Sequence, residues 1–538
     1  MAIRECAADA IKIINEYNGI VTDLDEENVY DAEVQVIPSV KDLSYNLENL
    51  EKRKDWIYDE ATSAQLVYLY GMIGHKFNGD ADLLFDLFGK KAENEDKNNL
   101  TVASLDIGGG TSDLMICKYT YKNNGTTEIL PDPLFWESFN LAGDDLVRDL
   151  IQQIIIEGNI TDESDKLCTG VIENGARARE IKNISQKLNG FFGKDSNNIG
   201  YKGKLMRTNF INQIAMPIVT QYMENANENK EFELTYEELF AETKPNIELL
   251  DYFEEHFGFR FEELNWKISS KKTNSIIASV FSKLIKQVSN VMHLYNCDLV
   301  VLAGRPCSFN SLEKLFYKYH SITPNRLINL NKFWIGRWYP FADNNGYIND
   351  PKTVVTIGCV ISLMGGSLFK LENFKIDIDH LKNKLISTAD FIGPIEDNAI
   401  AEEVLTPKIE SGHFTVNTLP VLIGFKRIQS RYYPSRPIYS VKFNDEKITE
   451  VVQRRGDMPD SKLADAIEEF KHKIRKKMPL KMYITRDFMR DKERIQIEEV
   501  TDFEHNDVSK SYFELHVQTM SDEAGYWLDT GEFILNVK

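Results

Sequence analysis

Cysteine is scarce in this sequence, and the cysteines that occur are not paired. The six cysteines are scattered without a Cys-x-x-Cys motif, and the nine histidines include no His-Glu-x-x-His motif. This pattern disfavours a disulfide framework and a zinc site, and it favours a reducing compartment. No apolar run reaches the length of about 18 residues that a membrane-spanning helix needs, and charges interrupt the first apolar stretch, unlike in a signal peptide. We therefore expect a cytoplasmic protein without a membrane span.

Basic residues are also in deficit. The chain of 538 residues carries 63 lysines and arginines against 83 aspartates and glutamates, a net charge of −20. Nucleic-acid binding requires a basic surface, so this balance argues against a nucleic-acid partner. Aromatic residues make up 11% of the chain, which argues against low-complexity disorder, and the length predicts roughly three to four folding units.

Alternating strands and helices predict an α/β core. Strands are expected at 102–105, 114–119, 134–140 and 298–302, and helices at 60–72, 276–295, 311–319 and 353–364. After residue 370 the pattern changes to strands at 416–426 and 438–443, a basic helix at 462–477, and two strands within 511–538. We therefore expect a separate, strand-rich α+β domain at 371–538.

The stretch from Asp106 to Asp113 (DIGGGTSD) lies between two predicted strands and carries the clearest chemical signal. Its glycines let the backbone approach a ligand closely, and successive amide N–H groups in such a turn form a nest that suits phosphate. Asp106, at the end of the strand, can hold a hydrated Mg²⁺ beside that phosphate. The alternative is a tight hairpin whose glycines serve only the turn. The candidate phosphate-binding residues are Gly108, Gly109, Gly110, Thr111 and Ser112.

Two further elements point to the same kind of site. The predicted strand at Val300 ends at Gly304 and is followed by Arg305, and ligands in α/β folds bind at the carboxyl ends of strands. Arginine there can stack on a base or contact a phosphate, although a strand-to-helix turn with a surface arginine explains the same residues. Asp59 and Glu60 open a small-residue helix whose N-terminus can face an anion, or whose acids simply favour the helix dipole.

In their order along the chain these elements resemble the actin-like ATPase superfamily of actin, DnaK-type chaperones and sugar kinases. The stretch from Asp106 to Asp113 resembles the second phosphate motif of that superfamily, and the stretch from Val300 to Pro306 resembles its adenosine motif. The segments 60–65 and 356–366 are similar to its two connecting helices, and Ala142-Gly143-Asp144 falls between the two motifs. The resemblance covers residues 1–370 and implies an actin-like, ribonuclease-H-like ATPase core.

A closer resemblance is to the SrfB-type virulence factors of bacteria. It extends over most of the chain, including the C-terminal domain, and it implies the same nucleotide-binding core without defining a reaction. The stretches that carry it are 59–70 (DEATSAQLVYLY), 105–114, 302–306 (LAGRP), 350–360 and 420–439 (PVLIGFKRIQSRYYPSRPIY).

The sequence departs from the superfamily pattern in two ways. No Asp-x-Gly hairpin precedes Asp59, so the first lobe is expected to be incomplete, with a remnant at 1–100 and a second lobe at 101–370 that carries a helical insertion at 160–265. The chain is then either the C-terminal part of a longer or split protein, or a protein whose first lobe has degenerated. A protein partner, such as a missing N-terminal portion or an operon-encoded subunit, would supply the absent strands. The second departure is Arg305, where chaperones carry a second glycine.

The resemblance implies a protein that binds a nucleotide, ATP being expected, together with Mg²⁺ held by Asp106. Gly304 and Arg305 would flank the nucleoside, and Glu60 and Asp59 are the further catalytic candidates beside Asp106. Such a protein would be a slow ATPase that acts as a conformational switch with a protein partner.

Two other functions stay open at this point. One is a nucleotide-free scaffold or interaction protein that keeps the actin-like fold and uses its C-terminal domain. The other is a small-molecule kinase, which would need a general base that the sequence does not reveal. The expected location is the bacterial cytoplasm, with secretion as an effector left open.

Overall fold

The computed structural model describes most of the chain after residue 59. The described residues are 60–91, 98–123, 126–157, 183–193, 199–258, 260–263, 266–348, 350–367, 371–378, 390–396, 399–428, 435–454, 460–489, 492–517 and 527–535. Asp59, one of the predicted catalytic residues, lies outside them.

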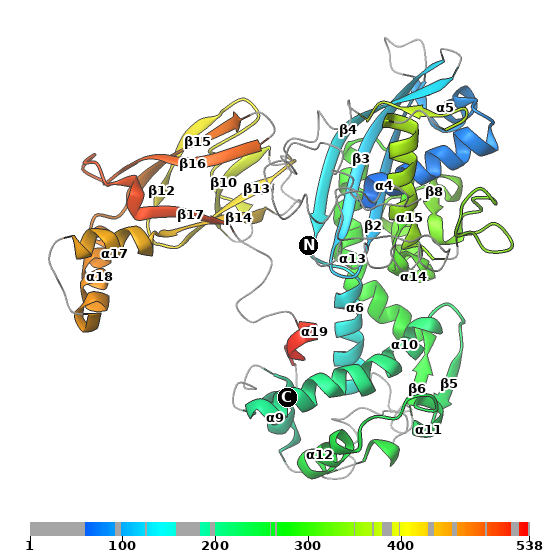
Figure 1. The fold of residues 1–538 in the computed structure, drawn as a ribbon, viewed down its shortest axis with the longest axis horizontal. Helices are drawn as coiled ribbons and strands as arrows, with labels where there is room; N and C mark the ends of the chain where they lie inside the picture. Colours follow the sequence, from blue (N-terminus) through cyan, green and yellow to red (C-terminus); the bar gives the residue numbers. More distant parts are fainter. Residues whose placement is uncertain are drawn as a thin grey trace, which may run out of the picture. The chain divides into compact units, whose positions relative to one another are not determined.

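A mixed parallel and antiparallel sheet forms the centre of the α/β part (Figure 1). Its strand order is β8-β7-β2-β3-β4-β9, and β1 pairs with β2 beside this path. Strands β2, β3 and β4 form an antiparallel meander, whereas β7 runs parallel to β2 and β8 parallel to β7. The strands are β1 Lys90–Lys91, β2 Asn98–Ile107, β3 Ser112–Asn123, β4 Thr127–Phe139, β7 Leu299–Ala303, β8 Leu327–Asn329 and β9 Lys375–Ile376.

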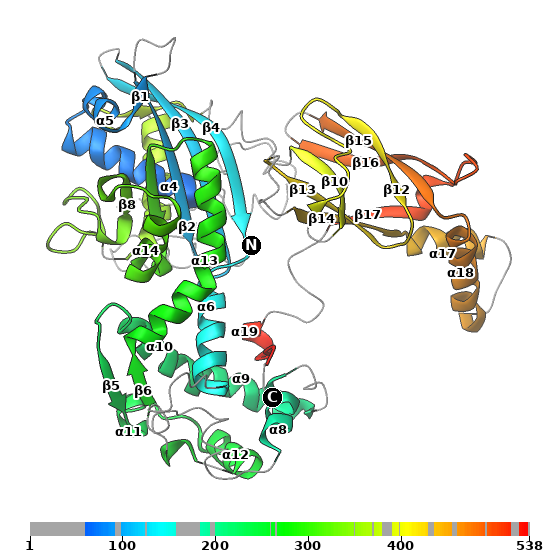
Figure 2. The ribbon, with the colours of Figure 1, turned by 180° about the vertical axis from the view of Figure 1, so that it is seen from behind.

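Helices cover both faces of this sheet. Its central strand β2 is therefore buried on both sides. Side chains alternate between the two faces of a strand. Leu105 and Ile107 join the hydrophobic core that includes the long helix α13 (Ser270–Leu294), and α14 (Asn310–Tyr319) contributes to the same core. The other face of β2 carries Ser104, whose hydroxyl donates to the carbonyl oxygen of Ala61 in helix α4. Figure 2 shows α13 running alongside β2.

Helix α4 (Glu60–Tyr70) packs closely on helix α15 (Thr353–Ser362) at Gly358. Every residue of α4 after Glu60 is buried. A Cβ atom added to Gly358 would lie 2.4 Å from the backbone oxygen of Ser63. Only glycine therefore permits this approach, and the crossing fixes α4 between α15 and the sheet.

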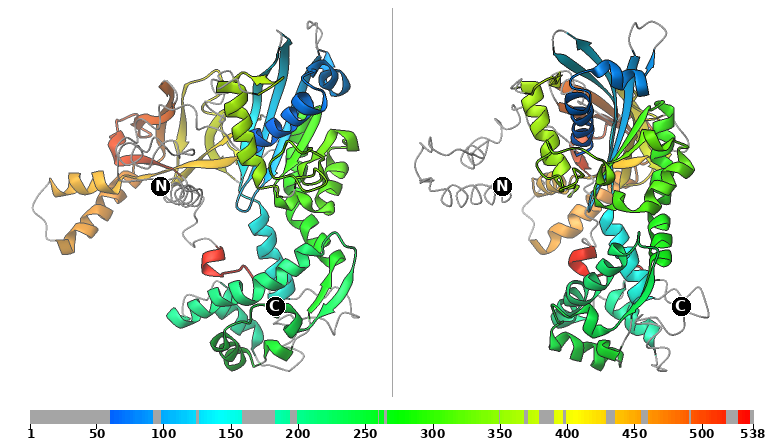
Figure 3. Two further views of the ribbon diagram at one scale, coloured as in Figure 1. Left: turned by 45° about the vertical axis from the view of Figure 1, so that its right-hand side comes forward. Right: turned by 90° about the vertical axis from the view of Figure 1, so that its right-hand side faces the viewer.

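A mainly helical segment follows the meander along the chain. Its core contains stacked aromatic rings, with Phe210 and Phe253 at 5.0 Å between centroids. The segment includes one two-stranded hairpin, and α13 leads from that hairpin back to the sheet (Figure 3). Its elements are α6 Gly143–Leu150, η3 Ile151–Ile156, α8 Ile184–Phe192, α9 Gly200–Phe210, η6 Ile211–Ala215, α10 Met216–Glu224, β5 Glu231–Leu234, α11 Tyr236–Leu239, α12 Ile247–Phe257 and β6 Trp266–Ser269.

The described residues from 390 to 517 form two further sheets and two helices. One sheet has the order β11-β10-β13-β14-β17 and the other β12-β15-β16. The elements are β10 Phe391–Glu396, β11 Ala399–Ile400, β12 Ser411–Val416, β13 Val421–Lys426, β14 Arg436–Phe443, α17 Asp445–Gln453, α18 Asp460–Arg475, β15 Leu480–Met489, β16 Lys492–Thr501 and β17 Phe513–Val517.

Two sequence-based expectations for this region are wrong. The strand predicted at 416–426 is in fact two strands, because β12 ends at Val416 and β13 begins at Val421 in a different sheet. Among the described residues after Gly525, the chain forms a short helix, α19 (Trp527–Thr530), where a strand was expected. Trp527 and Phe533 belong to the main hydrophobic core, so tertiary packing outweighs the local pattern there.

The crossing of α4 and α15 predicts a strong effect of a side chain at residue 358. Gly358→Val should lower the free energy of unfolding of this region by about 1–3 kcal/mol, because the new atoms meet backbone rather than a flexible side chain. Thermal unfolding followed by circular dichroism should show a midpoint roughly 2–12 °C lower. Thr356→Val, at an exposed position of the same helix, is the control and should leave the midpoint unchanged. An unchanged midpoint for Gly358→Val would contradict the crossing.

Candidate functional site

The glycine-rich motif forms the tip of the β2–β3 hairpin. Strand β2 ends at Ile107 and β3 begins at Ser112, so Gly108 to Thr111 make the connection. The amide of Gly108 donates to the carbonyl oxygen of Thr111 at 2.9 Å and closes the turn. Gly109 and Gly110 are exposed, and a Cβ atom at Gly110 would meet nothing within 4 Å. The backbone at the tip is thus open to a ligand.

Three successive amides at this tip point to an anion. Among the described residues, the N–H groups of Gly109, Gly110 and Thr111 donate to no acceptor. Backbone donors are normally paired, and successive unpaired ones in a turn form a concave site for an anion. The tip thus presents main-chain donors to an anion, and the carboxylate of Asp144 lies beside them, 3.5 Å from where a Cβ atom of residue 109 would stand.

Helix α6 braces the hairpin from behind. The amides of Gly143 and Asp144, in its first turn, donate to the carbonyl oxygens of Gly108 and Gly109 at 2.9 and 2.8 Å. The hydroxyl of Ser112 donates to the carbonyl oxygen of Leu141 at 2.6 Å. The first amides of α6 are therefore used to support the turn, and Ser112 serves the same purpose from its buried side chain.

Two carboxylates lie side by side at the base of the hairpin. Asp106 on β2 is the direct cross-strand partner of Asp113 on β3, and both side chains are buried. Asp113 accepts hydrogen bonds from the hydroxyls of Thr111, at 3.2 Å, and Ser138. Like charges directly opposite each other destabilise an antiparallel pair, so this arrangement favours a cation or additional donors nearby. The sequence did not predict Asp113 or Ser138 as site residues. The register of β2, β3 and β4 places Asp113 opposite Asp106 and Ser138 opposite Asp113.

The thiol of Cys307 lies within the electrostatic reach of this carboxylate pair. Burial raises the pKa of Cys307 well above its usual value, and the charge of Asp106 raises it further. A raised pKa disfavours the thiolate form of this side chain.

The end of β7 packs directly on the end of β2. Gly304 has a φ of +84°, and a Cβ atom there would lie 2.0 Å from the carbonyl oxygen of Ile107. Arg305, the next residue, has a side chain that is 67% exposed and lies 4.0 Å from a carboxylate oxygen of Asp350. Glycine is thus required by the contact between the two strand ends, and Arg305 stands at the surface beside them.

The predicted residues at the start of α4 lie on the same face as the carboxylates. Glu60 is exposed in the first turn of α4, and Ala61 accepts the hydroxyl of Ser104, two residues before Asp106. Residues two apart on a strand share a face, so the first turn of α4 and the Asp106 carboxylate are on one side of the sheet. The structure therefore brings every described candidate residue to the carboxyl-end edge of β2 and β7.

The family model described as Virulence factor SrfB matches residues 3–534, which is nearly the whole chain. The chain belongs to the SrfB virulence factor family. A search of curated proteins finds no match to the chain. The SrfB match includes the hairpin, both strand ends and the C-terminal sheets.

In this SrfB chain, an arginine from the C-terminal region contacts strand β4 next to the residue that pairs with Asp113. Arg436, at the start of β14, lies 3.1 Å from the carboxylate of the buried Glu137 on β4. Its guanidinium donates to the carbonyl oxygen of Ser138 and covers the ring of Phe139 at 4.4 Å. Ser138 thus contacts Asp113 through its hydroxyl and Arg436 through its carbonyl group.

The part of the chain that the structure describes shows neither a membrane-spanning helix nor a cluster of metal ligands. In that part, no helix is long and apolar enough to cross a membrane. No group of three or more His, Cys, Asp or Glu side chains is placed to hold a metal ion within the same residues.

The contact between Gly304 and Ile107 predicts a cost that exceeds ordinary backbone strain. Gly304→Ala should destabilise the protein by more than Gly200→Ala, since both glycines have positive φ but the space around Gly200 is empty. A positive φ costs an alanine on the order of 1–3 kcal/mol in either variant, and the backbone clash adds to this cost only at Gly304. Denaturant unfolding measures the difference. Equal losses in the two variants would contradict the contact between the strand ends.

Proposed function

We propose that the chain binds a nucleoside triphosphate, with ATP as the expected nucleotide, together with Mg²⁺ at the tip of the β2–β3 hairpin. One observation carries the proposal: the amides of Gly109, Gly110 and Thr111, which donate to no acceptor among the described residues, lie at the tip of the hairpin whose base holds the buried pair Asp106 and Asp113. The amides suit phosphate oxygens, and the carboxylates suit the cation that accompanies them. The site also lies at the carboxyl ends of strands, where ligands of α/β sheets bind.

The residues present fit Mg²⁺ better than a metal held entirely by protein. Mg²⁺ keeps several waters and is usually bound by one or two carboxylates and the phosphates of a substrate. The two carboxylates of Asp106 and Asp113, without a third acidic or histidine ligand among the described residues, match that requirement. When bound, the ion neutralises phosphate charge, and Thr111 and Ser138 orient Asp113 beside it.

The actin-like core is part of this proposal. Support comes from the mixed sheet with its glycine-rich hairpin, and from the close crossing of α4 and α15 at Gly358, the two segments that resemble connecting helices. Gly304 and Arg305 would then flank the nucleoside. In such a core the nucleotide state sets the angle between lobes, which makes the output a conformational switch with a protein partner.

Hydrolysis, if it accompanies binding, would be slow. In-line attack requires a group that orients water at the γ-phosphate, and Glu60 in the first turn of α4 is the described candidate for that task. Asp59 precedes it in sequence and shares the candidacy. A partner chain that supplies further strands would complete the phosphate clamp and raise the rate.

The alternative is a scaffold that keeps the fold without the nucleotide. It is favoured because packing alone explains several motif residues. Gly304 is required by its contact with the backbone of Ile107, and the first amides of α6 hydrogen-bond to the turn. The unpaired amides at Gly109 and Gly110 have no such role, which is why nucleotide binding is the preferred proposal.

Calorimetric titration with ATP, with and without Mg²⁺, tests the proposal. The expected result is Mg²⁺-dependent binding with a Kd in the micromolar range. Gly110→Val should abolish it, because the valine occupies the open space over the amides without meeting protein atoms within 4 Å of its Cβ. Asp113→Asn should weaken binding only when Mg²⁺ is present.

The matched control is Gly190→Val on α8, where a Cβ atom also meets nothing within 4 Å. It should bind ATP as the wild type does. Absence of binding by the folded wild-type protein, or equal binding by Gly110→Val, would reject the nucleotide site and leave the scaffold.

A further inference from the structure

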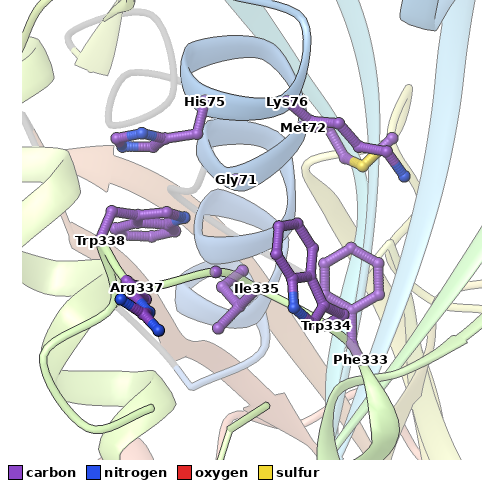
Figure 4. A pocket seen from close by; sticks show the side chains of 10 residues that line it. Gly71, Met72, His75, Lys76, Phe333, Trp334, Ile335, Arg337 and Trp338 are labelled. Atoms are coloured by element: carbon purple, nitrogen blue, oxygen red, sulfur yellow. The ribbon is translucent and has the colours of Figure 1, made fainter. Parts of the chain in front are cut away.

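A second candidate site lies at the other end of α4 from the hairpin. The chain continues from Tyr70 into a π-helical turn, η2 (Gly71–Lys76), and the loop Phe333–Trp338 lies against it. Between them is an open cavity of about 230 Å³ (Figure 4). The loop can approach the helical turn closely because residue 71 is a glycine. A Cβ atom at Gly71 would lie 2.7 Å from the Cδ1 atom of Ile335.

The loop that forms one wall is held in place by its own hydrogen bonds. The amides of Ile335 and Gly336 both donate to the carbonyl oxygen of Gly346, at 2.9 and 3.0 Å. The indole N–H of Trp334 donates to the carbonyl oxygen of Asn345 at 3.0 Å. A wall fixed in this way loses little conformational entropy when a ligand binds.

Aromatic rings dominate the wall and extend beyond it. The ring of His75 stacks on Trp338 with 4.7 Å between centroids and 3° between planes, as Figure 4 shows. Trp334 is 54% exposed, and Phe341 and Tyr347, from the same loop region, are 48% and 41% exposed. Exposed aromatic side chains close together in the chain are typical of an interaction surface.

Both charged side chains that line the cavity are cationic. Lys76 and Arg337 line it, and neither forms an ion pair with any residue that the structure describes. The indole nitrogen of Trp338 is buried and has no acceptor among those residues. No acidic residue lines the cavity, although the chain as a whole carries a net charge of −20. The cavity therefore complements a ligand that brings negative charge and hydrogen-bond acceptors.

His75 contributes a surface rather than a charge. Burial lowers the pKa of His75 below its usual value, so the imidazole is neutral at neutral pH and extends the aromatic wall. The positive charge of the site then comes from Lys76 and Arg337 at the rim.

We propose that this cavity binds a short acidic segment of a partner protein through one aromatic side chain. Its volume of about 230 Å³ is below the range of roughly 300–1,000 Å³ of pockets for drug-sized ligands, and it suits a single large side chain. Acidic residues on either side of that anchor face Lys76 and Arg337, and the backbone crosses the exposed ring of Trp334. Interfaces commonly concentrate their energy in such an aromatic anchor and its arginine neighbours. The site does not depend on nucleotide binding at the hairpin.

Selection from a random dodecapeptide library displayed on phage tests the proposal, with wild-type protein as the target and Arg337→Glu as the counter-target. The expected peptides contain an aromatic residue flanked by acidic ones. The strongest peptide, synthesised with a fluorescent label, should bind Arg337→Glu at least about tenfold more weakly in anisotropy titrations, and higher salt should weaken its binding to wild type. Trp334→Ala should weaken binding to a similar degree.

Lys314→Glu, which makes the same change of charge on the exposed side of α14, is the control and should bind the peptide as wild type does. Recovery of basic or non-aromatic peptides, or of none that discriminates wild type from Arg337→Glu, would overturn the proposal. Competition by phenylacetate at the concentration of the peptide would also overturn it, in favour of a small aromatic acid as the occupant.

Discussion

The buried amide of Gln65 fixes α4 on the central sheet, and both candidate sites depend on where this helix lies. Its Nε2 atom donates to the hydroxyl of Ser104 at 2.8 Å and to the carbonyl oxygen of Met115 at 3.1 Å, and its Oε1 atom accepts the hydroxyl of Tyr119 at 2.5 Å. A buried polar group is stabilising only when its hydrogen bonds are made, so the network permits one placement of the helix. The first turn of α4 is thereby set on the face of Asp106, and its last turn leads into the cavity at Gly71.

Much of the central sheet follows from local sequence. The apolar run from Leu299 to Ala303 and the glycines after Ile107 specify a buried strand and a tight connection before any packing is considered. Local sequence does not determine which face of the sheet a side chain occupies or which side chain lies opposite it. Asp113 becomes a neighbour of Asp106 only through the register of β2 and β3, and Ser138 only through the register of β3 and β4. Those registers follow from the whole sheet, which is why the sequence indicated Asp106 alone.

Other features arise from contacts between segments that are far apart in the chain. The cavity forms where the loop that contains Ile335 packs against Gly71. No sequence motif in either segment predicts this contact. The brace at Gly143 likewise depends on where α6 begins relative to the turn. In the C-terminal region, residues 416–426 look like one strand in sequence, although Val416 ends β12 and Val421 begins β13 in a separate sheet. Local patterns predict elements, whereas sites assembled from several elements require the fold.

The central claim is that the open amides and the carboxylate pair together hold a nucleotide and its metal. A crystal structure grown with Mn²⁺ and a non-hydrolysable ATP analogue tests it most directly, because Mn²⁺ gives an anomalous signal. The account predicts that signal beside the carboxylates of Asp106 and Asp113, with phosphate oxygens about 3 Å from the amide nitrogens of Gly109 and Gly110. An analogue bound elsewhere, or no analogue at saturating concentration in crystals that leave the hairpin tip open, would contradict it.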